Sequence, residues 1–249
     1  MLIFDRVYCM KYLNPFHILD IEPSTLKGEA SEVLKGLRQR LLAEFELHDT
    51  ATLILQDKEV DKAAVLFLLS ELENEAHRTH HAKIYASLGL RTFLEDGSLD
   101  LFETEIQEVF SDKDFATFIA PHFARQYNTR LYHLVKHQKL NDIERLANFK
   151  LPFPPKWIAQ CYQDSYRFLV YQLKDAKSMD RKMSVVNTYS PILAILPDYF
   201  DTIRNMYAPY KQASDFASLT ENFDEKNVKR VIWIGVGVAA AIALLTLIF

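Results

Sequence analysis

The last nineteen residues of the chain, Val231 to Phe249, read VIWIGVGVAAAIALLTLIF and carry no charged side chain. As an α-helix this segment would extend roughly 28 Å at about 1.5 Å per residue, close to the roughly 30 Å of a bilayer's hydrocarbon core. Its residues are apolar on every side rather than along one stripe, which favours lipid or a deep core over a protein surface. The segment, which includes Leu244, therefore predicts a C-terminal membrane anchor; a buried core helix is the alternative.

Residues around the start of this segment predict the orientation of the anchor. Lys229 and Arg230 precede it, and Trp233 lies where aromatic side chains favour the membrane–water interface. Because positive charge is enriched on the cytoplasmic side of membrane helices, we expect the large N-terminal body to face the cytoplasm. The expected topology is tail-anchored, with a single membrane helix last.

Small residues recur along one face of the predicted anchor. Gly235, Ala239 and Ala243 are four residues apart, a spacing that lets two membrane helices approach closely. Gly and Ala are also simply frequent in membrane helices. The hypothesis that follows is a homodimer formed through this face.

The body before the anchor has the composition of a helical protein. Only six residues are Gly and nine are Pro, which is few for a protein of short strands and tight turns. Leucines at helical spacing predict two long amphipathic helices joined by a short loop, within 24–47 and 57–89. The expected fold is all-α. Its parts are an N-terminal helical domain (1–112), a second helical domain (113–210), a polar linker (211–230) and the anchor (231–249).

Charge and cysteine content narrow the function classes. The formal net charge of −4 gives no electrostatic reason to expect a nucleic-acid partner. Cys9 and Cys161 cannot form a disulfide framework and have no metal-ligand spacing. The N-terminal run carries Asp5 and Arg6 and is unlike a secretory signal. These features favour a cytoplasmic body.

The stretch NPFHILDI, from Asn14 to Ile21, precedes a basic amphipathic helix, a loop and a second helix that ends HHAKIYASLG. This order resembles the J-domain of DnaJ-type co-chaperones, in which a short YxxLG-like element opens two packed helices. Phe16, Leu19 and Ile21 match the opening apolar positions, and Ala82 to Tyr85 match the close. The resemblance covers roughly residues 14 to 90 and implies a helical hairpin and a chaperone-related partner. Two packed helices without common descent are the alternative.

One departure from the J-domain pattern bears on activity. Working J-domains carry a His-Pro-Asp tripeptide between the long helices, and it stimulates a heat-shock ATPase chaperone. Here the nearest equivalent is His48, Asp49 and Thr50, without proline. The resemblance therefore implies a scaffold that has lost the stimulating role; an atypical J-type co-chaperone remains a second interpretation.

A histidine cluster is the strongest candidate for chemistry. His77 and His81 are four residues apart on one predicted helix face and His80 is adjacent, a spacing that can chelate zinc. Arg78 stands where a catalytic zincin would place its glutamate base. A solvated helix end with neutral histidines is the plainer interpretation, and we expect neither a metal nor another cofactor.

Aromatic residues on a later predicted helix suggest a partner surface. Trp157, Tyr162 and Tyr166 could line a groove for a partner helix, although such a stripe more often forms core. No phosphate loop or nucleophile elbow occurs. The sequence therefore favours a non-catalytic protein-interaction or scaffold module held on a membrane. A membrane-tethered metal-dependent enzyme using the histidine cluster is the alternative.

Overall fold

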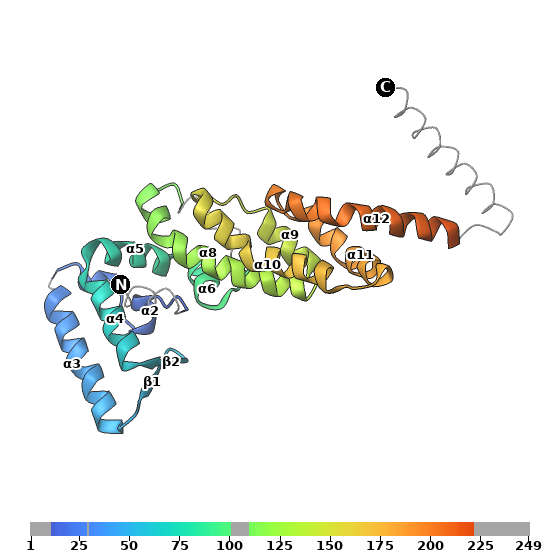
Figure 1. Ribbon diagram of the computed structural model, residues 1–249. Coiled ribbons are helices and arrows are strands. Elements are labelled where there is room, and N and C mark those ends of the chain that lie inside the picture. Colours follow the sequence, from blue (N-terminus) through green and yellow to red (C-terminus); the bar gives the residue numbers. More distant parts are fainter. Residues whose placement is uncertain (1–10, 29, 101–109, 222–249) are drawn as a thin grey trace. The chain divides into compact units, whose positions relative to one another are not determined.

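The computed structural model describes residues 11–28, 30–100 and 110–221 (Figure 1). Helices make up most of these residues, which confirms the predicted helical character of the body. None of the helices in the described ranges combines the length and the apolar character needed to cross a membrane. The predicted anchor, its small-residue face and its orienting charges lie outside the described residues.

The chain divides into two compact units, Met1–Ser165 and Tyr166–Phe249. This differs from the domain boundary expected between residues 112 and 113. The reason is the long helix α8 (Lys113–Lys136), which packs against two helices of the N-terminal half, α5 (Glu75–Ala86) and α6 (Leu88–Asp96). A helix that the sequence assigned to the second domain thus belongs to the first unit.

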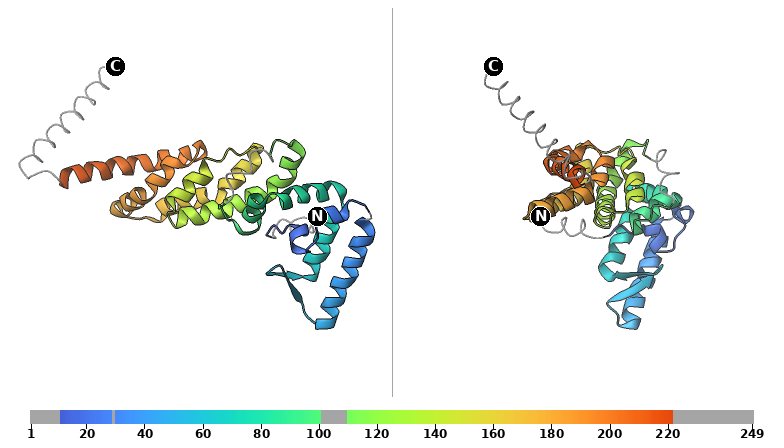
Figure 2. Two further views of the ribbon diagram at one scale, coloured as in Figure 1. Left: turned by 180° about the vertical axis from the view of Figure 1, so that it is seen from behind. Right: turned by 90° about the vertical axis from the view of Figure 1, so that its right-hand side faces the viewer.

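The first unit begins with two short elements and a helical pair. The elements, in order, are α2 (Pro15–Ile18), the 3-10 turn η1 (Pro23–Leu26), α3 (Ala30–His48), β1 (Thr52–Leu55), β2 (Lys58–Asp61) and α4 (Lys62–Glu73). Helices α3 and α4 run antiparallel, which is visible from the front and from behind (Figures 1 and 2). Their shared core contains Leu34, Leu41, Val65 and Leu69, all at helical spacing and all buried.

A β-hairpin lies between α3 and α4, where the sequence predicted a plain loop. Strands β1 and β2 are antiparallel, with Leu55 opposite Lys58 and Leu53 opposite Val60. Gln56 and Asp57 both have positive φ, 47° and 59°, as a two-residue type I′ turn requires. The turn lacks the Asn-Gly or Asp-Gly pair that marks such hairpins, so glycine content gave no sign of it.

The second long helix expected over 57–89 is broken in the structure, where strand β2 is followed by α4, α5 and the start of α6. Asn74 ends α4 and caps α5 by accepting hydrogen bonds from the N–H groups of Ala76 and His77. Ser87 then caps α6 by accepting from the N–H of Leu90. These caps turn the chain, because a side chain that satisfies the first N–H groups of a new helix competes with continuation of the old one.

Among the described residues, the first unit also contains α8, α9 (Leu140–Ala147) and the first part of α10 (Pro155–Asp175). The second unit holds the rest of α10 with α11 (Met179–Ile195), the 3-10 turn η2 (Asp198–Phe200) and α12 (Asp201–Glu221). Buried side chains between α11 and α12 include Ile192, Leu193, Ile203 and Tyr207.

Helix α12 extends into the stretch where the sequence predicted a polar linker from residue 211. Lys211 and Asp215 form an ion pair of 2.9 Å between side chains four residues apart, which supports a helix. The Nδ2 of Asn187 on α11 also donates to Ser214 Oγ at 2.6 Å. Polar composition was therefore compatible with a helix here, because its polar groups pair with each other and with α11.

Candidate functional site

Four histidines surround one aromatic ring in the first unit. The ring of Phe118 on α8 lies 5.3 Å from that of His77, 4.8 Å from His80 and 5.1 Å from His81, all on α5, measured between centroids. His122, one turn further along α8, is 6.1 Å away. The helical pattern that placed the predicted cluster on α5 was correct, and α8 adds a member from far along the chain.

A single carboxylate organises two of these histidines. One oxygen of Glu71 on α4, Oε2, lies 3.0 Å from His77 Nδ1 and 3.1 Å from His81 Nε2. Because a carboxylate only accepts, each ring nitrogen donates its N–H. Burial alone raises the pKa of Glu71, but the hydrogen bond from His81 and the nearby imidazoles outweigh it and lower the pKa. Glu71 therefore acts as an ionised acceptor for both rings.

The other ring nitrogen of His81 faces the N-terminal segment. Tyr12 Oη lies 2.9 Å from His81 Nδ1. With the proton of neutral His81 on Nε2, Nδ1 is an acceptor, so the phenol donates to it. His81 is 3% exposed, and this burial lowers its pKa, although the bond to Glu71 opposes the shift. Both ring nitrogens of a neutral His81 are thereby satisfied.

Asn14 connects this chain of hydrogen bonds to the backbone. Its Nδ2 donates to Tyr12 Oη at 3.2 Å and to the His81 carbonyl at 2.9 Å. Its Oδ1 accepts from the N–H groups of Phe16 and His17, which caps α2. Asn14 is fully buried, and every donor and acceptor of its amide is used.

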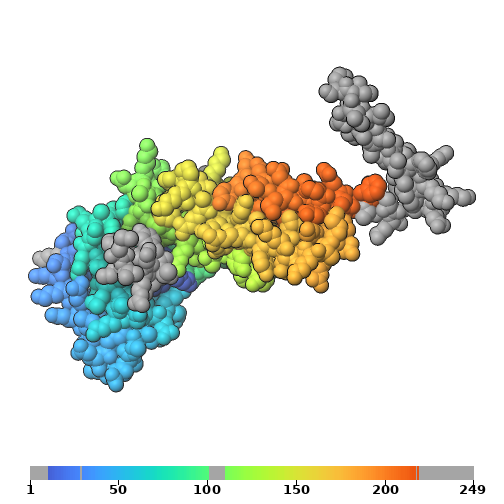
Figure 3. Space-filling view, viewed as in Figure 1, coloured from blue at the N-terminus to red at the C-terminus, as the bar shows by residue number. Residues whose placement is uncertain are grey.

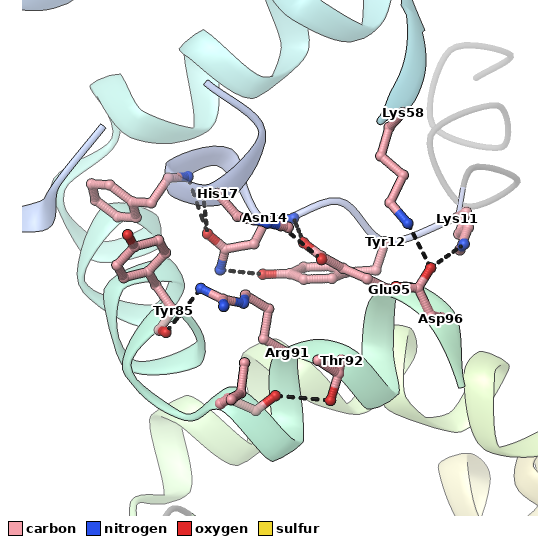
Figure 4. Close-up of polar contacts among 12 residues, drawn as sticks. Lys11, Tyr12, Asn14, His17, Lys58, Tyr85, Arg91, Thr92, Glu95 and Asp96 are labelled. Atoms are coloured by element: carbon pink, nitrogen blue, oxygen red, sulfur yellow. Dashed lines mark hydrogen bonds and ion pairs between the residues drawn. The ribbon is translucent and has the colours of Figure 1, made fainter. Parts of the chain in front are cut away.

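A second buried carboxylate holds the same segment from α6. Glu95, 1% exposed, accepts from the Asn14 N–H at 3.0 Å through Oε1, and its Oε2 lies 2.9 Å from His17 Nδ1 (Figure 4). Next to it, Asp96 forms ion pairs with Lys11 at 3.0 Å and with Lys58 of β2 at 2.7 Å. The N-terminal segment is thus fixed to α5 and α6 by polar contacts.

A small cavity of about 50 Å³ adjoins this network. Its lining includes Tyr12, Phe67, Glu71, His81 and His122. Burial lowers the pKa of His122 to about 4. The cavity has room for ordered water, and at neutral pH its imidazoles are uncharged.

The structure bears directly on metal binding by the predicted cluster. The N–H groups of His77 and His81 point at Glu71, while Nδ1 of His80 is buried without a hydrogen-bond partner among the described residues. Within those residues, no three His, Cys, Asp or Glu side chains are placed to hold a metal ion together. Burial also raises the pKa of the Tyr12 phenol, which disfavours a nucleophilic phenolate. The arrangement is well suited to fixing chain segments together.

The predicted aromatic partner surface is divided between core and surface. Tyr162 is 4% exposed and its ring packs edge-on against Tyr127 at 5.7 Å, so it belongs to the core of the first unit. Trp157 is half-buried, with Lys156 Nζ 4.8 Å from its ring centroid. Tyr166, in the second unit, is half-buried against Tyr199 at 5.8 Å. The three side chains therefore do not form one exposed surface.

The residues matched to the J-domain opening and close share one core. Phe16, Leu19 and Ile21 are buried, and Tyr85 packs against the same cluster with its ring 6.0 Å from that of Phe16. Ala82 also packs against this cluster. At the other end of α3, His48, Asp49 and Thr50 are exposed and lead into the β-hairpin.

Sequence reasoning missed most members of the network. Tyr12, Glu71, Glu95 and His122 have no local pattern that marks them, since their partners lie on other elements. Asn14 did carry a signal, because an Asn directly before Pro is typical of a helix N-cap. No family model matches the chain, and neither the curated proteins nor the solved structures contain a match to it.

Proposed function

We propose that this protein is a membrane-tethered interaction module whose helical body binds other proteins at the cytoplasmic face of a membrane. The observation that carries the proposal concerns the end of the first unit, where α3 leads into the β-hairpin. The two most exposed large hydrophobic side chains of the described residues, Leu47 at 82% and Ile54 at 70%, lie there. Both lie between residues 47 and 54, and exposed apolar side chains of this kind can supply contact area for a partner protein.

The histidine network also supports the proposal, because its arrangement favours a structural role over a catalytic one. Glu71 accepts hydrogen bonds from His77 and His81, and the phenol of Tyr12 donates to His81, so these groups satisfy one another. A catalytic group needs an open position beside the reacting atom and a pKa near the working pH. The network is better suited to holding the N-terminal segment on the helices, as a rigid scaffold requires. A metal-dependent enzyme based on these histidines is the weaker alternative.

The membrane part of the proposal depends on the uncharged stretch from Val231 to Phe249. Full-length protein should stay with membranes after alkaline carbonate extraction, and deletion of 231–249 should release it. Protease protection of right-side-out and inverted vesicles then tests the cytoplasmic orientation. Recovery of the full chain in the soluble fraction would contradict the anchor.

Proximity labelling tests the interaction part. The full chain should label a reproducible set of proteins that is absent when residues 222–249 carry an unrelated folded domain in place of the body. The same set with both baits would mean that the body recruits nothing, and the interaction function would then be wrong.

A J-like scaffold is a second, more specific candidate, favoured by the closure of Phe16 on Tyr85 and by the antiparallel pairing of α3 and α4. The hairpin stands where the His-Pro-Asp loop would be, so we expect no co-chaperone activity. The rate of ATP hydrolysis by a heat-shock ATPase chaperone should change less than about twofold when the full chain is added in detergent. This limit corresponds to roughly 0.4 kcal/mol in the activation free energy of hydrolysis. Strong stimulation would favour the atypical co-chaperone instead.

A further inference from the structure

The outer edge of strand β1 presents backbone groups without partners. In a hairpin with a two-residue turn, the closing pair, Leu55 and Lys58, exchanges hydrogen bonds, and bonded and non-bonded pairs then alternate. Thr52 and Ile54 therefore turn their N–H and C=O groups away from β2. These groups have no hydrogen-bond partner within the described ranges.

The position of the hairpin leaves this edge open. Strand β2 leads into α4 and contacts it, whereas β1 lies on the outer side of the hairpin in Figure 1 and in the left view of Figure 2. In the space-filling view, the lighter-blue segments near residues 45–60 form the tip of the first unit, and no other described part covers them on that face (Figure 3). The inner face is packed, since Leu53 and Leu55 contact the buried core.

The two edges of the hairpin differ in chemistry. β2 reads KEVD and carries the charged residues that usually guard a free strand edge. β1 reads TLIL and has no charge, proline or bulge. An uncharged, β-branched edge strand with Ile54 70% exposed is a ready template for an added strand.

We propose that β1 is a docking edge for an extended segment of a partner protein, which adds as a third strand beside Thr52 to Leu55. This rests on the proposed interaction function and names the chemistry of the partner. Every second residue of the segment faces outward, on the side of Ile54. One of these outward residues is apolar and covers Ile54, and the outward residues on either side of it are basic and reach past β1 to the acidic side chains of Glu59 and Asp61. Both acidic residues are exposed, and they stand opposite Ile54 and Thr52 in the register.

A second copy of this chain is a less suitable occupant. Stable dimers bury about 1,200–2,000 Å² in total, and a pairing of two four-residue strands covers much less. A short strand donated by a different chain fits a weak, reversible contact.

Two proline variants compare the two edges directly. Ile54→Pro removes an outward N–H from β1, and Glu59→Pro removes the outward N–H of the residue directly opposite, on β2. The probe is a fluorescent heptapeptide with lysine, valine and lysine at its even positions and threonine at its odd positions, so that lysine and valine share one face of the strand. Its binding to the full chain in detergent is measured by polarisation. Two further probes replace lysine by glutamate or methylate alternate backbone nitrogens.

We expect the valine–lysine peptide to bind with a dissociation constant on the order of 0.1 mM. Ile54→Pro and backbone methylation should each weaken binding at least about tenfold, and Glu59→Pro less than about twofold, because only the β1 edge donates to the peptide. Ile54→Lys retains the backbone N–H and places a like charge on the edge, so it should also weaken binding if proline disturbs the hairpin. The glutamate peptide should bind at least about tenfold more weakly.

Absence of binding at about 1 mM peptide, or equal losses in Ile54→Pro and Glu59→Pro with Ile54→Lys unaffected, would overturn the proposal. The results also distinguish failure of the docking-edge proposal from failure of the proposed interaction function. If the body recruits proteins at the membrane and the peptide ignores β1, only the docking edge is wrong. If the peptide binds β1 and the body recruits no proteins, the interaction function is wrong and the edge chemistry stands.

Discussion

The hydrogen bond between Tyr12 and His81 offers the sharpest test of the network, through the change Tyr12→Phe. The ring remains and only the hydroxyl is lost, so ring packing against His122, 5.1 Å between centroids, is preserved. The variant removes the donor to His81 Nδ1 at 2.9 Å and the acceptor for Asn14 Nδ2 at 3.2 Å. The change therefore isolates polar contacts between the N-terminal segment and α5.

The magnitude follows from what is left unpaired. His81 Nδ1 becomes a buried acceptor without a donor, whereas Asn14 Nδ2 retains its bond to the His81 carbonyl at 2.9 Å. Two lost bonds at about 0.5–1.5 kcal/mol each give a loss of about 2 kcal/mol in the free energy of unfolding of the first unit. For a unit of this size, about 2–4 °C per kcal/mol predicts a melting temperature lower by about 4–8 °C.

Tyr85→Phe is the matched control. The Tyr85 hydroxyl donates to Glu22 at 3.1 Å in an exposed pair, so its loss should cost less than about 0.5 kcal/mol. Urea unfolding of both variants at pH 7.5, followed by far-ultraviolet circular dichroism, gives the two free energies. Equal effects of the two variants would refute the view that the buried network holds the N-terminal segment in place.

Three further predictions address pH, backbone geometry and the anchor. Burial lowers the pKa of His122 from 6.5 to about 4, so the folded chain binds fewer protons than the unfolded chain between these values. Its stability should fall by roughly 3 kcal/mol as the pH drops from about 6.5 to 4, and His122→Phe should flatten that part of a urea-midpoint-against-pH curve. Gly97 ends α6 at φ 71°, and a Cβ there would lie 2.7 Å from Gln126 Nε2, so Gly97→Ala should cost about 1–2 kcal/mol in thermal unfolding. Ala239→Leu should abolish cross-linked dimers in membranes if the small-residue face pairs two anchors; dimers at the wild-type level would contradict that pairing.

The helices of the body could be predicted because their cores repeat along the sequence. Leu34, Leu37 and Leu41 recur at helical spacing and are all buried in α3. The breaks were harder to predict, because Asn74 and Ser87 end one helix and begin the next through side-chain hydrogen bonds that a hydrophobic pattern does not record. Periodicity therefore predicted which residues are helical better than where each helix ends.

The candidate site was only partly predictable for a different reason. His77, His80 and His81 were found because their spacing is local, and their place on one helix was correct. What they do depends on Glu71 and on His122, which tertiary packing brings to them from α4 and α8. The sequence shows which side chains could bind a metal ion, but it does not show whether a neighbouring carboxylate accepts hydrogen bonds from their N–H groups instead.

Satisfied and unsatisfied polar groups point to different functions for the two ends of the first unit. The residues with the most reactive chemistry lie in the network, where a hydrogen bond to a neighbour is worth more than exposure to a ligand. Thr52 and Ile54 on β1 carry outward backbone donors and acceptors that no other described residue pairs, and a search for reactive side chains passes over them. Because an open strand edge can gain hydrogen bonds by adding another strand, we propose to seek partner binding at the hairpin. If so, substitutions at Ile54 should change binding and leave stability nearly intact, whereas substitutions at Tyr12 should do the reverse.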